Sequence, residues 1–101
     1  MILIDPPAVA RWGRLWSHLA SDTSYAELHA FAHVQGIPER GFDRDHYDVP
    51  SEFYDRMVAA GAVPVTSREL VARLREAGLR RRKGRQEGRQ AARPPAPPPA
   101  G

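Results

Sequence analysis

The sequence contains no cysteine among its 101 residues. This absence excludes disulfide-stabilised folds, thiolate nucleophiles and zinc sites with cysteine ligands. No run of about 18 apolar residues occurs either, so the sequence predicts no membrane-spanning helix. The short apolar run near the N-terminus ends at Asp5 and has no basic flank, unlike a secretory signal, so we expect a cytoplasmic protein. A chain of this length allows one domain at most.

Positive charge is scarce in most of the chain and concentrated at its C-terminal end. Residues 1–79 contain 8 arginines and no lysine against 11 acidic residues, a net charge of −3. Residues 80–101 contain 7 basic residues against 1 acidic residue, a net charge of +6. The net charge of +3 for the whole chain therefore describes a basic tail on a mildly acidic domain.

The basic tail lacks every aromatic and β-branched residue type. Such a segment buries too little apolar surface to offset the entropy lost on ordering. We therefore predict a compact domain over residues 1–79 and a disordered Arg/Pro-rich tail over residues 80–101. The tail's charge predicts weak, salt-sensitive contact with nucleic acid or with an acidic protein, and no membrane partner.

Three helices are predicted over about 24–35, 50–60 and 67–77, because an apolar stripe with helical spacing runs along each segment. Each segment begins at a capping residue or a proline and is followed by a glycine. These are the ordinary start and stop signals of a helix.

Three short strands are predicted: the apolar run 2–4, the segment 46–49 and the β-branched segment 62–65. Four apolar residues within 6–21 have helical spacing, but that segment begins with two prolines, so we expect only partial helix there. Helices and strands that alternate along the chain favour a small single α/β domain with about three short strands and three to four helices.

The stretch FDRDHYDVP, residues 42–50, concentrates acidic residues around one histidine. If residues 46–49 are extended, His46 and Asp48 point to one face and Tyr47 to the other. His46 is then a candidate ligand or general base that Asp48 orients. The structural alternative is a helix cap, a local ion pair and a buried tyrosine. The spacing matches no named catalytic motif.

Further imidazoles and carboxylates are candidates for the same site. Asp5 ends the first predicted strand, where it can hold a cation or a ribose, or cap the following turn. Asp22 follows His18 by four residues and is alternatively a helix N-cap. A set of imidazoles and carboxylates without cysteine suits zinc, manganese or iron, so a divalent metal is the candidate cofactor. The candidate metal ligands are His18, Asp22, His29 and His46, the candidate catalytic residues are His18, Asp22 and His46, and the candidate cofactor-binding residues are Asp5, Asp48 and Tyr47.

Several segments together resemble one family. They are ILIDPP, LWSHL, SDTSYAELHAFA, FDRDHYDVP and GAVPVTSRELVARLREAGLR. The chain resembles the short bacterial proteins of domain-of-unknown-function family 4031 over residues 2–80, and HYDVP is among the most specific matching pieces. This family has no established activity, so the resemblance supports a single domain over residues 1–79 and implies no catalytic residue.

Two hypotheses of function follow, and they leave open whether the domain is an enzyme. The first is a small metal- or phosphate-binding domain with a site of histidines and aspartates, for which hydrolysis is the candidate reaction. The second is a non-catalytic protein-interaction module whose basic tail contacts nucleic acid weakly. The first hypothesis requires these side chains to converge beside a cavity, whereas the second lets them scatter over the surface.

Overall fold

The computed structural model describes residues 1–81, which form a mixed six-stranded sheet and three α-helices. The strands are β1 (Ile2–Ile4), β2 (Val9–Arg11), β3 (Arg14–Ser21), β4 (Phe42–Asp43), β5 (His46–Pro50) and β6 (Val63–Pro64). The helices are α1 (Tyr25–Val34), α2 (Tyr54–Ala59) and α3 (Ser67–Glu76), and short 3-10 turns occur at Glu39–Gly41 and Ser51–Phe53. The small α/β domain is confirmed, with more strands than expected. Of the predicted tail over 80–101, residues 82–101 lie outside the described residues.

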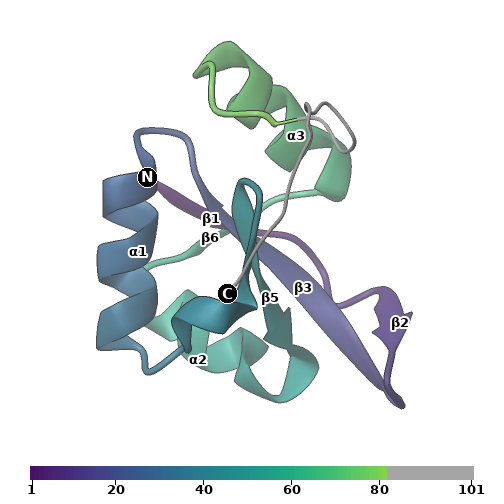
Figure 1. The fold of residues 1–101 in the computed structure, drawn as a ribbon. Helices are drawn as coiled ribbons and strands as arrows, with labels where there is room; N and C mark the ends of the chain where they lie inside the picture. The colour runs from purple at the N-terminus through teal and green to yellow at the C-terminus, as the bar shows by residue number, and fades with distance from the viewer. Residues whose placement is uncertain (82–101) are drawn as a thin grey trace, which may run out of the picture.

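The long strand β3 organises the sheet because three other strands pair with it. β5 pairs antiparallel with one edge of β3, and β1 and β2 pair antiparallel with the other edge. β4 continues the sheet beyond β5, and β6 lies parallel to β1. The order is therefore β4-β5-β3-β1-β6, with β2 beside the N-terminal part of β3 (Figure 1).

Helices pack on both faces of this sheet (Figure 1). On one face, Leu28 of α1 and Met57 of α2 share a core with Leu19 of β3. On the other face, Leu70 of α3 packs with Ala20 of β3. Neighbouring residues of β3 thus enter different cores, because successive side chains of a strand point to opposite faces. α3 covers only part of its face, and the rest carries the candidate site.

All three predicted segments contain a helix, and the capping residues of the first and third are confirmed. The predicted start of the second is wrong, because Pro50 ends β5 and α2 begins only at Tyr54, after a 3-10 turn. The side chain of Ser24 accepts a hydrogen bond from the backbone N–H of Glu27 at 3.0 Å, which starts α1. The side chain of Thr66 accepts one from the backbone N–H of Glu69, also at 3.0 Å, which starts α3. These side chains satisfy backbone donors that have no partner inside the helix.

The expected partial helix over 6–21 is wrong, because this segment forms the β2–β3 hairpin. Trp12 and Gly13 occupy its two-residue turn, with φ angles of 52° and 74°. Positive φ at both turn residues characterises a type I′ turn, whose twist matches that of paired antiparallel strands. Of the four apolar residues at helical spacing, only Leu19 is fully buried, whereas Trp12 and Leu15 are exposed, so the spacing did not mark a buried helix face.

The burial along β3 predicts different costs for two leucines of the same strand. Leu19 is 0% exposed and Leu15 is 45% exposed. We expect Leu19→Ala to lower the free energy of unfolding by about 2–5 kcal/mol, because it leaves a cavity in a packed core. Leu15→Ala is the matched control and should cost less than about 1 kcal/mol. Urea denaturation measures both values, and equal losses would contradict the strand assignment.

Candidate metal centre

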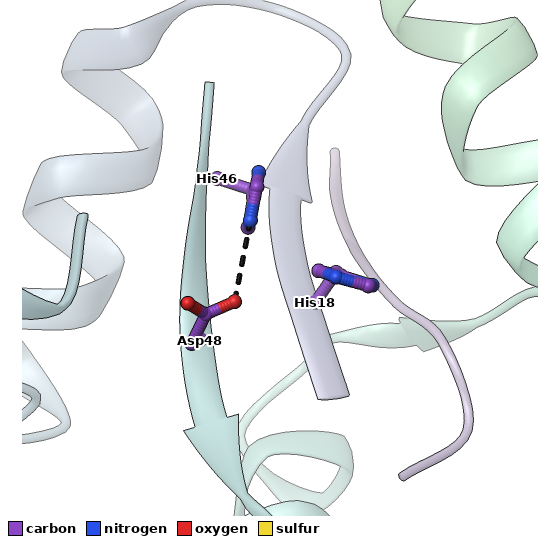
Figure 2. Close-up of side chains that lie close together, drawn as sticks. All are labelled: His18, His46 and Asp48. Carbon is purple, nitrogen blue, oxygen red and sulfur yellow. Dashed lines mark ion pairs between the residues drawn. The ribbon is translucent and has the colours of Figure 1, made fainter. Parts of the chain in front are cut away.

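Three side chains, His18, His46 and Asp48, converge on the face of the sheet that α3 covers in part (Figure 2). His18 lies on β3, opposite Asp48 of β5 in the strand register, and His46 precedes Asp48 by two residues. The two imidazole rings meet edge to face, with centroids 4.8 Å apart. One ligand atom from each of the three residues lies within 4.8 Å of the others, so the group could hold a metal ion.

His18 is held by Asp5, the residue that follows β1. Oδ2 of Asp5 lies 2.8 Å from Nδ1 of His18, and Oδ1 accepts a hydrogen bond from the backbone N–H of His18 at 2.6 Å. Ser67 at the start of α3 donates to the same carboxylate at 2.7 Å. Burial by itself raises the pKa of Asp5, but these hydrogen bonds outweigh it and keep the pKa below its ordinary value. Since an ionised carboxylate can only accept, Nδ1 of His18 donates to it, and in the neutral tautomer of the ring Nε2 is then the acceptor.

His46 is held in the same way by its neighbour Asp45. Nδ1 of His46 lies 2.8 Å from Oδ1 of Asp45, whose side chain is 0% exposed. On the other side of the ring, Nε2 lies 3.2 Å from Oδ1 of Asp48. Burial by itself lowers the pKa of His46, but the two carboxylates outweigh it and raise the pKa to about 9. These carboxylates therefore stabilise a positive charge at Nε2, whether a proton or a metal ion carries it.

The segment that follows α3 contacts Asp45 from the other side. Arg81 donates its backbone N–H to Oδ2 of Asp45 at 2.9 Å, and the guanidinium group of Arg80 donates to the same oxygen at 3.2 Å. The hydroxyl of Tyr25 on α1 donates to the backbone carbonyl of Leu79. The first two residues of the predicted tail thus satisfy a buried carboxylate of the domain.

A cavity of about 160 Å³ borders the two histidines. His18, His46 and Ser67 line it on the polar side, and leucines of α3 line the apolar side. Two arginines, Arg44 and Arg80, also line it. The cavity can therefore admit a small polar or anionic ligand next to the imidazoles.

Two predicted site residues, Tyr47 and His29, lie on the opposite face of the sheet. Tyr47 points away from its neighbour His46, as the alternation of a strand requires, and it is buried. Its hydroxyl lies 2.6 Å from Nδ1 of His29 on α1, and both rings pack against Phe42. The structure therefore does not bring Tyr47 or His29 to the group of His18, His46 and Asp48.

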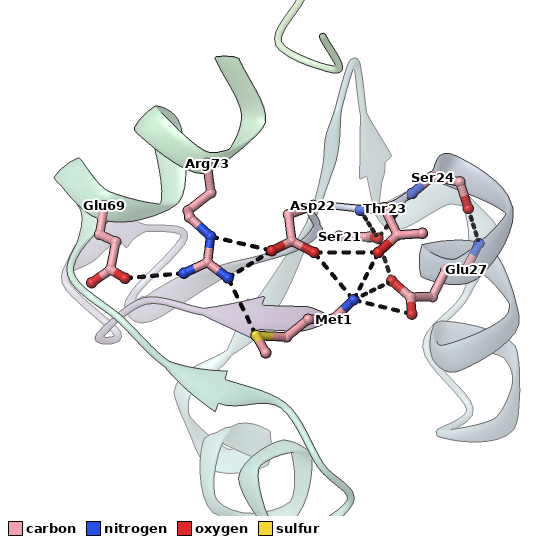
Figure 3. Close-up of polar contacts among 8 residues, drawn as sticks. All are labelled: Met1, Ser21, Asp22, Thr23, Ser24, Glu27, Glu69 and Arg73. Atoms are coloured by element: carbon pink, nitrogen blue, oxygen red, sulfur yellow. Dashed lines mark hydrogen bonds and ion pairs between the residues drawn. The ribbon is translucent and has the colours of Figure 1, made fainter. Parts of the chain in front are cut away.

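Asp22 follows the end of β3 and joins a separate polar network (Figure 3). Its Oδ2 accepts hydrogen bonds from Nη2 and Nε of Arg73 on α3, at 2.6 and 3.2 Å. Its Oδ1 lies 3.1 Å from the amino group of Met1, which also contacts Glu27 of α1. Four residues along an extended strand span about 13 Å, so the spacing from His18 to Asp22 separates them instead of bringing them onto one helix face.

Two residues that support the site, Ser67 and Arg80, carried no signal in the sequence. They reach the carboxylates Asp5 and Asp45 only because α3 packs across the strands. A signal did exist for Asp45, which directly precedes His46 in an acidic stretch. Of the four predicted metal ligands, His18 and His46 converge beside a cavity, together with Asp48, whereas Asp22 and His29 lie elsewhere.

The raised pKa of His46 predicts how the stability of the metal-free domain depends on pH. A histidine with a higher pKa in the folded state stabilises that state fully below its unfolded pKa of 6.5, and the contribution disappears as the pH rises through about 9. The loss amounts to about 3 kcal/mol at most. Urea denaturation with a chelator, at about pH 6 and about pH 9.5, measures it. His46→Gln should reduce this pH dependence, and an unchanged dependence in the variant would contradict the assignment.

The family resemblance seen in the sequence is confirmed by comparison with models of known families. The family model described as "Protein of unknown function (DUF4031)" matches residues 2–77. Neither a curated protein nor a solved structure matches the chain. Within residues 1–81, no helix is long and apolar enough to cross a membrane. His18, His46 and Asp48 all lie inside the matched region. The chain therefore belongs to the DUF4031 family, whose function is unknown.

Proposed function

We propose that this domain binds a divalent transition-metal ion through Nε2 of His18, Nε2 of His46 and the carboxylate of Asp48. The observation that carries the proposal is that a separate buried carboxylate holds Nδ1 of each histidine, Asp5 for His18 and Asp45 for His46. Histidines that bind metals almost always donate their other ring N–H to a carboxylate or a carbonyl, which fixes the ring and raises its basicity. Both candidate ligands have this arrangement.

The charge around the two rings also supports a cation. Asp5, Asp45 and Asp48 all contact the two histidines, at 2.8 to 3.2 Å. Three carboxylates beside two imidazoles leave an excess of negative charge when the rings are neutral. Guanidinium groups offset this in part, since Arg80 contacts the far oxygen of Asp45 at 3.2 Å and Arg11 lies 3.8 Å from Oδ2 of Asp48. The negative charge that remains favours a cation among the three ligands.

Two imidazoles and one carboxylate suit zinc, manganese or iron(II), and they leave coordination positions for water or substrate. An ion held in this way lowers the pKa of a bound water and polarises a bound oxygen, so hydrolysis is the reaction class that the residues support best. The neighbouring cavity is lined by Arg44, whose positive charge would attract an anionic substrate.

Zinc titration of the untagged full-length chain tests the proposal. Isothermal titration calorimetry should show one zinc ion bound per chain. His18→Gln, His46→Gln and Asp48→Asn should each weaken binding by more than about 100-fold, since loss of a ligand costs more than loss of an outer partner. Asp5→Asn, which removes the charge that orients His18, should weaken binding by about 10- to 100-fold.

The matched control is His33→Gln, because His33 is an exposed histidine of α1 outside the group. This variant should bind zinc like the wild type. Circular dichroism establishes that each variant is folded. Equal loss of binding in His33→Gln, or retention of binding in both His18→Gln and His46→Gln, would exclude the proposed centre.

A further inference from the structure

A larger cavity, of about 620 Å³, extends from Asp48 to the β2–β3 hairpin. Its lining includes Trp12 and Trp16 of the hairpin, the arginines Arg11 and Arg40, and Asp48. Cavities of about 300–1,000 Å³ are typical of sites for small organic ligands. Because Asp48 belongs both to this lining and to the candidate metal centre, a ligand in the cavity would lie next to the metal ion.

Trp12 occupies a position that the fold alone does not explain. Its side chain is 75% exposed, and its φ of 52° is a conformation that costs free energy for any residue other than glycine. The first position of such a turn normally carries asparagine, aspartate or glycine. The indole of Trp12 lies edge-on to that of Trp16, with centroids 5.7 Å apart, and both line the cavity. The turn therefore presents an aromatic surface to the cavity at a cost in backbone strain.

The indole of Trp16 is fixed in place, because its Nε1 donates to the backbone carbonyl of Arg11 at 2.9 Å. The hairpin thus holds one tryptophan by a hydrogen bond and leaves the other, Trp12, exposed beside it. An exposed indole next to a fixed one is suited to stack on a planar ligand, and every nucleobase offers such a face.

The charged groups of the cavity suit an anion that lies close to Asp48. The guanidinium of Arg11 lies 4.9 Å from the Trp12 ring centroid, and its Nη1 lies 3.8 Å from Oδ2 of Asp48. Asp43, the other acidic lining residue, pairs with Arg44 at 3.4 Å. If Asp48 binds the metal ion proposed above, its charge no longer neutralises Arg11. The guanidinium and the ion would then attract the same anionic group.

We propose that this cavity binds a nucleotide, with the base against Trp12 and the phosphate between Arg11 and the metal ion at Asp48. The position of the phosphate rests on the proposed metal centre, whereas the position of the base rests on the hairpin alone. An aromatic surface recognises the base, and a guanidinium beside a metal ion recognises the phosphate. A free nucleotide and the end of a single strand share this chemistry.

Calorimetry with the zinc-loaded full-length chain tests the proposal with adenosine 5′-monophosphate and its two halves, adenosine and ribose 5-phosphate. The monophosphate should bind more tightly than either half. Trp12→Ala should weaken its binding by about 5- to 100-fold, the usual effect of removing one stacking partner, and should leave zinc affinity unchanged. Trp12→Phe should retain most of the affinity, because it keeps an aromatic face. Leu15→Ala is the matched control, since Leu15 is an exposed apolar residue of the same hairpin that does not line the cavity.

A short single-stranded oligodeoxyadenylate distinguishes the two sources of the ligand. Tighter binding of the oligonucleotide, with the same loss in Trp12→Ala, indicates the end of a strand, and tighter binding of the monophosphate indicates a free nucleotide. Equal affinity for the monophosphate and ribose 5-phosphate, or an unchanged affinity in Trp12→Ala, would overturn the proposal. If the monophosphate binds through Trp12 but the chain binds no zinc, the nucleotide site stands and the metal centre fails. If zinc binds but the monophosphate does not, the metal centre stands and the nucleotide site fails.

Discussion

The antiparallel register of β3 against β5 is the constraint on which the candidate site depends. This register places His18 directly opposite Asp48 and Leu19 opposite Tyr47. A slip of one residue would turn His18 toward α1 and α2 and move Leu19 out of their core, because strand side chains alternate between faces. Leu19 and Tyr47 are both buried in that core, which therefore disfavours the slip. The same pairing thus determines the packing of the core and the geometry of the site.

Two buried carboxylates couple the histidines to α3. Asp5 accepts a hydrogen bond from Ser67, the first residue of α3, and Asp45 accepts hydrogen bonds from Arg80 and Arg81, which follow it. A buried carboxylate costs free energy unless hydrogen bonds compensate it, and both carboxylates are compensated. Each carboxylate contacts one histidine and also one residue at the start of α3 or just after its end. The orientation of the two rings and the docking of α3 therefore depend on the same two groups. The two carboxylates thus connect the candidate site to the packing of α3.

Local signals predicted the three helical segments and three of the six strands within residues 1–81, because caps, glycines and apolar spacing act within a few residues. The β2–β3 hairpin could not be predicted in this way, since its turn carries Trp12 where asparagine or aspartate is usual. In the site, the common face of His46 and Asp48 followed from the alternation of an extended segment. The approach of His18 to them depends on the pairing of strands distant in sequence, which no local pattern specifies. Whether His18 and Asp22 lie close together depends on whether their segment is helical or extended, since four residues span about 6 Å along a helix and about 13 Å along a strand, and the segment is extended.

Anomalous diffraction at the zinc absorption edge, from crystals of the full-length chain grown with zinc, would locate the metal ion directly. A metal centre formed by His18, His46 and Asp48 predicts one anomalous peak at about 2.0–2.2 Å from Nε2 of each histidine and from a carboxylate oxygen of Asp48. The Nδ1 atoms of both rings should still face Asp5 and Asp45. A peak beside His29 and His33 instead, or no peak between the two imidazoles, would contradict the proposed centre.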